Sequence, residues 1–302
     1  MTSFLGIVAN TLLPIFLIVG LGVLVERRLK INPRALSRVV VYLFSPCLVL
    51  GSMAQSDLGA GELGGIIGAA TIISLLMTMV GWALARLFRL EHKLASAFVL
   101  SVVLVNAGNY GLALNEFAYG SAGVERAVIF FVVTAMVGNT LGVYLASRGT
   151  ASIRRSLLNV LTVPLPYATA LGLTLNLSGR SLPLPIERAV TVLGDAAVPC
   201  MMLVLGLQLS RTVVKGRIGP IALATAARLI IAPLIAFPVT GALGLTGLAR
   251  QVSIIEASMP TAVTAGVLAT EFGGDAEYVT AVILVSTVAS ALSLGVLLSI
   301  LM

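Results

Sequence analysis

Two stretches of the chain combine residues that interrupt helices with polar groups that can bind small ions. The first, Asn106-Ala-Gly108-Asn109-Tyr-Gly111, places two amides and two glycines within six residues. Glycine costs about 1 kcal/mol relative to alanine in a helix, and amide side chains compete for backbone hydrogen bonds. In the second stretch, SIIEASMPTAVTAGVLATEF, Pro260 removes a backbone donor and clashes with the preceding turn. Both stretches therefore predict a helix that is interrupted near its middle.

An interrupted helix offers a ligand two kinds of helix end. The half-helix that starts at the break presents free N–H groups and partial positive charge, whereas the half-helix that ends there presents free carbonyls and partial negative charge. Anions suit the first end and cations suit the second. Ordinary kinks, with Ser258 and its neighbouring threonines bonding the freed carbonyls, are the structural alternative. The predicted substrate-binding residues are Asn106, Gly108, Asn109, Gly111, Pro260, Thr261, Thr264 and Arg228.

Three ionisable residues lie inside apolar runs: Asp195, Arg228 and Glu256. A charge at the centre of a bilayer costs about 2.5–3.5 kcal/mol on insertion scales, so each needs a partner, a watery cavity or a function. Glu256 lies one helical turn before Pro260, where its carboxylate can join free carbonyl groups. Such oxygen ligands suit a sodium ion, and a carboxylate in apolar surroundings also suits a proton. Arg228 either neutralises an anionic substrate or pairs with Glu256 or Asp195, and Asp195 either serves the function or caps a kink.

The elements that position these residues are expected to be membrane helices. Of 302 residues, 58% are hydrophobic and 10% are charged, and the mean hydropathy is +1.08. A soluble domain carries about a quarter of its residues as charges. The predicted fold class is an all-α polytopic membrane protein, because apolar stretches long enough to cross a bilayer recur along the whole chain. Ten transmembrane helices are predicted, at residues 4–25, 35–54, 63–88, 94–115, 124–147, 157–177, 186–209, 218–245, 250–272 and 276–301.

The basic residues fall mostly in alternate loops between these spans. Fourteen lie on one side and four, Arg126, Arg180, Arg188 and Arg250, on the other. Because basic loops stay in the cytoplasm, both termini are predicted to lie outside it, in a multi-pass protein of the inner membrane. The fourteen are Arg27, Arg28, Lys30, Arg34, Arg38, Arg86, Arg89, Lys93, Arg148, Arg154, Arg155, Arg211, Lys215 and Arg217.

The two halves of the chain resemble one another. Pro46-Cys47 is followed directly by Leu-Val-Leu-Gly51, and Pro199-Cys200 is followed, after two methionines, by Leu-Val-Leu-Gly206. Late in each half, Gly111, Glu116 and Phe117 correspond to Gly266, Glu271 and Phe272, all at a spacing of 155. Each half contains five predicted spans, an odd number, so the second copy must be inverted relative to the first. We therefore predict two repeats, 1–150 and 151–302. Their fourth spans, helices 4 and 9 of the whole chain, are broken and cross near the bilayer midplane.

Other classes of function fit these residues less well. The basic residues lie in short clusters between apolar runs, which points to the lipid bilayer and not to nucleic acid. The single histidine, His92, lies in a charged turn, and no nucleophile–histidine or metal-ligand set occurs at membrane depth, so an enzyme is not expected. Cys47 and Cys200 are interpreted as packing residues. An anion channel is the alternative of another class, because broken helices also build pores.

The ninth predicted span carries a family resemblance. VSIIEASMPTAVTAGVLATEFGGDAEYVTAVI resembles the corresponding stretch of the auxin efflux carrier family, which includes plant PIN carriers and many bacterial members. The segment that starts at Arg228 resembles the family's eighth span, and Asn106 with Gly111 resembles its fourth, although the family's proline there falls at Ala113. Ile255-Glu256-Ala-Ser-Met259 is also similar to the bile acid sodium symporters, whose glutamate at this place binds sodium, whereas plant auxin carriers have glutamine there.

The resemblance implies a secondary active transporter of small organic anions, auxin-like or dicarboxylic, that works by an elevator movement. Residues 1–55 and 156–210 (helices 1, 2, 6 and 7) would form a scaffold and the contact of a homodimer, while 62–148 and 218–302 would move with the substrate. Sodium coupling is favoured, with proton coupling or uniport as alternatives, and no other cofactor is implied. The ion-coupling residues would be Glu256 as the sodium ligand, with Asn106, Ser258 and Met259.

Overall fold

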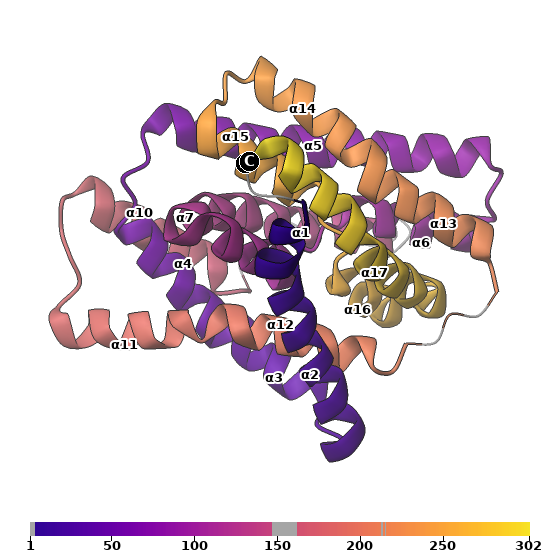
Figure 1. Ribbon diagram of the computed structural model, residues 1–302, viewed down its shortest axis with the longest axis horizontal. Helices are drawn as coiled ribbons and strands as arrows, with labels where there is room; N and C mark the ends of the chain where they lie inside the picture. Colours follow the sequence, from indigo (N-terminus) through magenta and orange to yellow (C-terminus); the bar gives the residue numbers. More distant parts are fainter. Residues whose placement is uncertain (1–3, 147–161, 213, 215) are drawn as a thin grey trace.

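The computed structural model describes residues 4–146, 162–212, 214 and 216–302, and the described part of the chain is helical with one isolated β-bridge (Figure 1). Five of the helical segments, labelled η, are π-helical turns inside longer helices. The segments are α1 (Phe4–Ile7), η1 (Val8–Leu12), α2 (Leu13–Leu29), α3 (Pro33–Val39), η2 (Val40–Phe44), α4 (Ser45–Ala54), α5 (Ala60–Leu87), α6 (His92–Val103), η3 (Ala107–Leu112), α7 (Ala113–Val137), η4 (Gly138–Gly142), α8 (Val143–Ala146), α10 (Leu165–Leu177), α11 (Leu184–Asp195), α12 (Ala197–Leu209), α13 (Ile218–Ala226), η5 (Ala227–Ile231), α14 (Ala232–Ala242), α15 (Gly247–Ala257), α16 (Val263–Glu271) and α17 (Ala276–Leu301).

Seven helical stretches of the described residues are long and apolar enough to cross a membrane. Large apolar side chains such as Leu75, Met79, Leu234 and Leu292 are exposed on their outer faces, as expected for a protein embedded in lipid. The seven stretches are Phe4–Leu29, Pro33–Ala54, Ala60–Leu87, Ala107–Ala146, Leu184–Leu209, Ile218–Ala242 and Ala276–Leu301.

The seven long stretches and the ten predicted spans differ for identifiable reasons. The predicted span 94–115 is divided between α6 and the start of a longer helical stretch, and the predicted span 250–272 is divided between α15 and α16. Residues 157–161 of the predicted span 157–177 lie outside the described residues. The stretch Ala107–Ala146 joins parts of two predicted spans, but Gly120 inside it has φ 65° and ψ −156°, a backbone turn that L side chains rarely adopt. The number of membrane crossings therefore stays a prediction.

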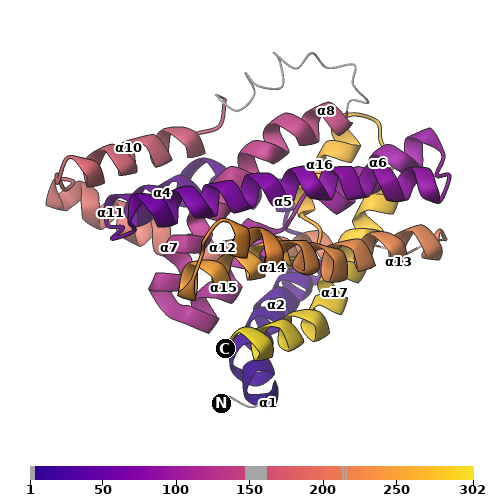
Figure 2. The same ribbon diagram turned by 90° about the horizontal axis from the view of Figure 1, so that it is seen from above.

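Two groups of helices are joined through α7, which contacts α5 as well as α4, α10 and α12. In Figure 1, α2, α4, α10, α11 and α12 occupy the lower and left part of the view, where α2 packs along α12, and α4 contacts both α10 and α11. The helices α5, α13 and α14 occupy the upper part. Figure 2 places α1 next to the end of α17, and the Phe4 ring of α1 lies beside Gly295 of α17. The first and last described helices are thus at the same end of the molecule.

Glycines let the helices of the first group approach closely. A Cβ atom on Gly22 of α2 would lie 2.6 Å from the carbonyl oxygen of Leu203 in α12, and one on Gly206 would overlap the carbonyl oxygen of Val19. Small residues are the usual means of bringing membrane helices into contact, because lipid provides no hydrophobic drive for helix association. The α2–α12 pair is therefore fixed by backbone-to-backbone packing.

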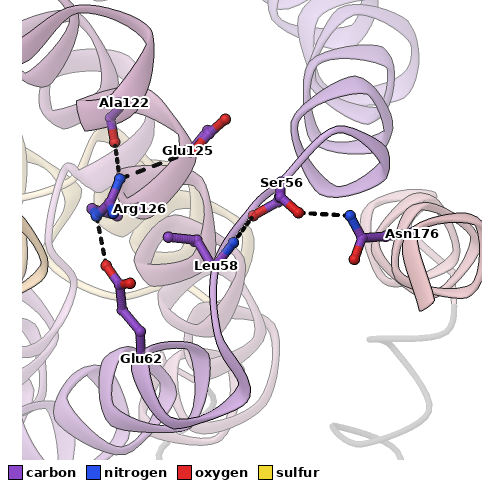
Figure 3. A network of polar contacts seen from close by, with 7 residues as sticks. All are labelled: Ser56, Leu58, Glu62, Ala122, Glu125, Arg126 and Asn176. Atoms are coloured by element: carbon purple, nitrogen blue, oxygen red, sulfur yellow. Dashed lines mark hydrogen bonds and ion pairs between the residues drawn. The ribbon is translucent and has the colours of Figure 1, made fainter. Parts of the chain in front are cut away.

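A network of polar contacts ties the segment between α4 and α5 to its neighbours (Figure 3). Asn176 Nδ2 of α10 donates to the carbonyl oxygen of Ser56 (2.7 Å), and the Ser56 hydroxyl accepts from the Leu58 N–H (3.3 Å). Beyond this segment, Glu62 of α5 pairs with Arg126 of α7 at 2.7 Å. A side chain of α10 thus holds the segment before α5, and a side chain of α7 holds the start of α5.

Candidate functional site

Two helices are interrupted, and the interruptions lie against each other. The helix α6 ends at Val103 and η3 begins at Ala107, while α15 ends at Ala257 and α16 begins at Val263. The short non-helical stretches between them contain Asn106 and Pro260, two of the residues expected to break the helices from sequence. We call the place where these stretches meet the crossing.

The two non-helical stretches pair as antiparallel backbone segments. The Asn106 N–H donates to the carbonyl oxygen of Pro260 (2.9 Å), and the Ala262 N–H donates to the carbonyl oxygen of Leu104 (2.8 Å). Val105 and Thr261 thereby form the isolated β-bridge of the described residues. The Thr261 hydroxyl donates to the carbonyl oxygen of Ser101 (2.8 Å). These bonds use some of the backbone groups that both breaks leave free and hold four half-helix ends together.

Arg228 occupies the negative side of the crossing. Its side chain is 1% exposed, and its guanidinium donates to the carbonyl oxygens of Ala257 (Nη2, 2.6 Å), Met259 (Nη2, 2.8 Å) and Val102 (Nη1, 3.2 Å). These carbonyls lie at the ends of α15 and α6, where helices carry partial negative charge. Among the described residues, Arg228 forms no ion pair with Glu256, Asp195 or any other carboxylate. The positive charge of one guanidinium thus offsets the partial negative charge at the ends of both helices.

The positive side of the crossing has no such partner within the described residues. The second half-helices begin after Asn106 and Ala262, and neither residue caps the following turn with a side-chain hydrogen bond. Asn106 is 3% exposed, and its amide nitrogen Nδ2 has no hydrogen-bond partner among the described residues. A buried donor without an acceptor costs about 1–3 kcal/mol, so such a group indicates a place for a ligand. Two helix starts and an amide donor therefore form a site suited to an anion.

A second buried polar group, around Glu256, adjoins the crossing. Glu256 is 0% exposed, and its Oε1 accepts from Asn115 Nδ2 at 2.8 Å. Asn115 Nδ2 also donates to the carbonyl oxygen of Gly111 (2.9 Å). The carboxylate lies so close to Gly111 that a Cβ atom there would overlap both of its oxygens. Gly111 thus serves the close approach of a carboxylate, in addition to weakening the helix.

The Glu256 site has oxygen atoms available for a cation. Glu256 Oε2 and Asn115 Oδ1 are both buried and have no hydrogen-bond donor among the described residues. A carboxylate, an amide oxygen and backbone carbonyls are the ligand types that a hard cation prefers. The described residues contain no group of three or more His, Cys, Asp or Glu side chains that could hold a metal ion. The donor set fits a sodium ion or a proton better than a transition metal.

The remaining predicted site residues lie at different depths. Gly108 faces the Phe131 ring, since a Cβ atom there would lie 2.7 Å from a ring carbon, and Asn109 is half-buried beside it. Ser258 is buried and bonds the carbonyl oxygen of Ile254 (2.6 Å), a contact within its own helix turn. Thr264 is exposed on α16, and Asp195 is exposed at the end of α11.

Sequence reasoning missed several polar residues of the site. Asn115 is 0% exposed and contacts Glu256, but it was interpreted as the last residue of a span. Its spacing from Gly111, one helical turn, is the signal that could have revealed it. In α17, Ser290 donates to the buried Tyr110 hydroxyl (3.3 Å), and Ser286 accepts from the Thr261 N–H (3.2 Å). A run of hydroxyl residues on one face of the last apolar span is the corresponding signal.

A cavity of about 940 Å³ adjoins the crossing along α16. Its lining includes Val263, the first residue of α16, and the basic residues Lys30, Arg34 and Arg38.

The two cysteines, Cys47 and Cys200, are free and half-buried.

Comparison with known proteins agrees with a transporter. A family model described as membrane transport protein matches residues 7–154 and 146–298. An "Uncharacterized transporter" of Methanothermobacter thermautotrophicus is 31% identical over 278 residues, 91% of this chain and 89% of its own length. A second "Uncharacterized transporter", from Methanocaldococcus jannaschii, is 26% identical over 90% of this chain and 89% of its own. A protein of Rhizobium meliloti named "Putative malonate transporter" is 24% identical over 94% of this chain and 92% of its own.

Proposed function

Since this chain belongs to the auxin efflux carrier family of membrane transport proteins, we propose that it is a secondary active carrier of small organic anions. It is a transporter and not an enzyme. The proposed substrates are carboxylates, with dicarboxylates such as malonate first among them because one relative is named for malonate. The proposed binding site is the crossing.

The charge distribution at the crossing is the observation that carries this proposal. Four half-helix ends meet there, two positive and two negative. The negative ends already hold a cation, since the Arg228 guanidinium donates to Ala257, Met259 and Val102. Within the described part of the chain, the positive ends have no side-chain cap and the Asn106 amide beside them has a donor without an acceptor. A carboxylate would supply the missing acceptors and the missing negative charge.

A coupling ion is proposed at Glu256. The buried carboxylate and Asn115 provide oxygen atoms next to the crossing. A cation there would be close enough to an anion at the crossing for each to favour binding of the other. We favour sodium, with Ser258, Met259 and Asn106 contributing further backbone or side-chain oxygens, and a proton is the alternative. Without either ion the protein would be a uniporter.

The proposed architecture extends the observed helices to ten membrane crossings. The repeats 1–150 and 151–302 would be inverted relative to each other, with helices 4 and 9 crossing near the midplane. Residues 1–55 and 156–210 would form the scaffold and the contact of a homodimer, and 62–148 and 218–302 would move as an elevator. From the basic loops, both termini would lie outside the cytoplasm, with the protein in the inner membrane.

Removing the Asn106 amide should weaken anion binding without unfolding the protein. Wild type should be stabilised against heat by at least one monocarboxylate or dicarboxylate in a panel that includes malonate and indole-3-acetate. Asn106→Ala should bind that acid roughly 10- to 100-fold more weakly, because a hydrogen bond to a charged partner contributes about 1.5–3 kcal/mol. Thermal unfolding at graded acid concentrations measures both affinities.

A matched amide variant controls for a nonspecific loss of anion binding. Asn139 donates to the carbonyl oxygen of Ala135 one turn away (2.9 Å) and lies outside the crossing, so Asn139→Ala should bind with wild-type affinity. Equal affinity in wild type and Asn106→Ala would remove the crossing as the site. An ohmic anion current far above carrier turnover would instead identify a channel.

A further inference from the structure

The cavity beside α16 has one wall made by a single helix face. Five of its lining residues recur at the three- and four-residue spacing of one face, from the first residue of α16 to the last: Val263, Gly266, Val267, Thr270 and Glu271. A helix of this length spans about 13 Å at about 1.5 Å per residue. The cavity therefore extends along the whole of α16, from the crossing to the far end of that helix.

The inner end of the cavity reaches a positive helix start. Val263 follows directly after Ala262, which begins α16 without a side-chain cap and donates its own N–H to Leu104 across the crossing. Any anion bound at the crossing next to α16 would therefore have this cavity beside it.

Part of the cavity wall is basic. Lys30, Arg34 and Arg38, from the end of α2 and from α3, are exposed and line it. Arg211 also lines it, but its guanidinium is already paired with Glu26 at 2.7 Å. Glu271 is the one carboxylate among the lining residues of the described chain. Among the described residues, three cations without an ion pair and one carboxylate thus line the cavity, which gives its wall an excess of positive charge.

We propose that this cavity is the route by which carboxylate anions pass between the crossing and the side of the protein that carries the basic loops, and that Lys30, Arg34 and Arg38 attract them into it. A cleft lined by charges of one sign focuses the electric field and concentrates ions of opposite sign. This inference rests on the proposed function for the identity of what is carried. The attraction of anions into the cavity is a property of its walls and can be measured without any substrate.

The rate at which charged thiol reagents modify a cysteine in the cavity measures that attraction. Cys47 and Cys200 are first replaced by alanine, and Thr270→Cys then places one thiol on the cavity face of α16. Each reagent's rate at this cysteine is divided by its rate with a free thiol. We expect the corrected rate of an anionic methanethiosulfonate to be at least about fivefold higher than that of a cationic one. Raising the salt concentration to about 1 M should remove most of this preference by screening.

Two triple variants separate the cavity from the general basic surface. Lys30→Gln, Arg34→Gln and Arg38→Gln together should lower the anionic preference at Thr270→Cys at least about threefold. Arg86→Gln, Arg89→Gln and Lys93→Gln remove the same number of charges on the same predicted side, outside the cavity lining, and should leave it unchanged. A thiol introduced at Leu87, which is 73% exposed beside Arg86, should show the reverse pattern. Its anionic preference should fall in the variant that lacks Arg86, Arg89 and Lys93 and stay unchanged in the variant that lacks Lys30, Arg34 and Arg38. Thermal unfolding of each variant checks that it is folded.

The same preference in both lipid conditions would support a route for soluble anions. Phospholipid headgroups share the carboxylate's negative charge, so the measurement is made in nanodiscs of zwitterionic lipid and of lipid with about a third anionic headgroups. A preference lost only with anionic lipid would mean that headgroups fill the cavity, and would overturn the route. The route would also be overturned if the anionic and cationic reagents reacted at equal corrected rates at Thr270→Cys. It would be overturned as well if both triple variants changed the anionic preference there by the same amount. None of these outcomes alters the Asn106→Ala result, so the proposed function would stand or fall separately.

Discussion

Replacing Glu256 by glutamine should abolish the effect of the coupling ion on substrate binding. In the wild type, sodium but not potassium should stabilise the protein and raise its affinity for the carboxylate, and the carboxylate should raise sodium affinity by the same factor. Glu256 is completely buried and has one oxygen without a partner among the described residues, so an empty, charged site would be costly. Glutamine keeps the shape and removes the charge that the cation neutralises. Isothermal titration of each ligand with and without the other measures the coupling.

The same variant distinguishes a proton from sodium. If a proton is the coupling ion, sodium should have no effect, and wild-type affinity for the carboxylate should vary with pH and become flat in Glu256→Gln. Glu116→Gln, an exposed carboxyl group next to Asn115, should keep the wild-type ion dependence as a control. An undiminished ion effect in Glu256→Gln would exclude this carboxylate as the coupling site. If carboxylate binding to the wild type depends on neither sodium nor pH, the carrier is a uniporter.

Removing the charge of Arg228 should weaken dicarboxylate binding far more than monocarboxylate binding. At a separation of about 10 Å and an effective dielectric constant of about 20, one positive charge contributes about 1.7 kcal/mol to a monoanion and twice that to a dianion. Arg228→Met should therefore lower affinity roughly 20-fold for a monocarboxylate and roughly 300-fold for a dicarboxylate. Binding of the two acids is compared by titration on the same preparation.

Arg228→Lys is the matched control for this prediction. Lysine keeps the charge but cannot reach three carbonyls with one rigid fork, so both variants should lose stability. Only the methionine variant should change the ratio of the two affinities. A purely structural role would lower both affinities by one common factor in both variants, and that result would contradict the electrostatic role.

The positions of the helix interruptions follow from local chemistry, whereas the partners of the buried charges do not. Pro260 and the glycine–amide stretch around Asn106 weaken a helix wherever it packs, and Pro260 and Asn106 both lie in the non-helical segments. The first break lies at residues 104–106, just before the glycines, because Ala107–Leu112 forms the π-helical segment η3. The sequence leaves Arg228 two roles, neutralising an anionic substrate or pairing with Glu256 or Asp195. Among the described residues it pairs with neither carboxylate and contacts main-chain carbonyls. Those carbonyls are free only because two helices end beside it, which is a property of tertiary packing.

The site at Glu256 illustrates the same limit. A carboxyl group before Pro260 could be assigned an ion from sequence, but its contact with Asn115 depends on where the fourth predicted span ends. Prediction ended that span at residue 115, whereas the helix continues to the backbone turn at Gly120. Asn115 therefore lies buried within a helix and not at its edge. Helix boundaries are the part of a sequence-based assignment most open to such errors.

Counterflow in proteoliposomes tests the central claim, carriage of an organic anion through the crossing, most directly. Vesicles preloaded with an excess of an unlabelled carboxylate that stabilises the protein should transiently accumulate the same labelled acid from outside. The uptake should saturate with concentration and should be strongly reduced in Asn106→Ala but not in Asn139→Ala. Wild-type vesicles that show no counterflow with any stabilising carboxylate, or an Asn106→Ala variant that exchanges at the wild-type rate, would contradict the account.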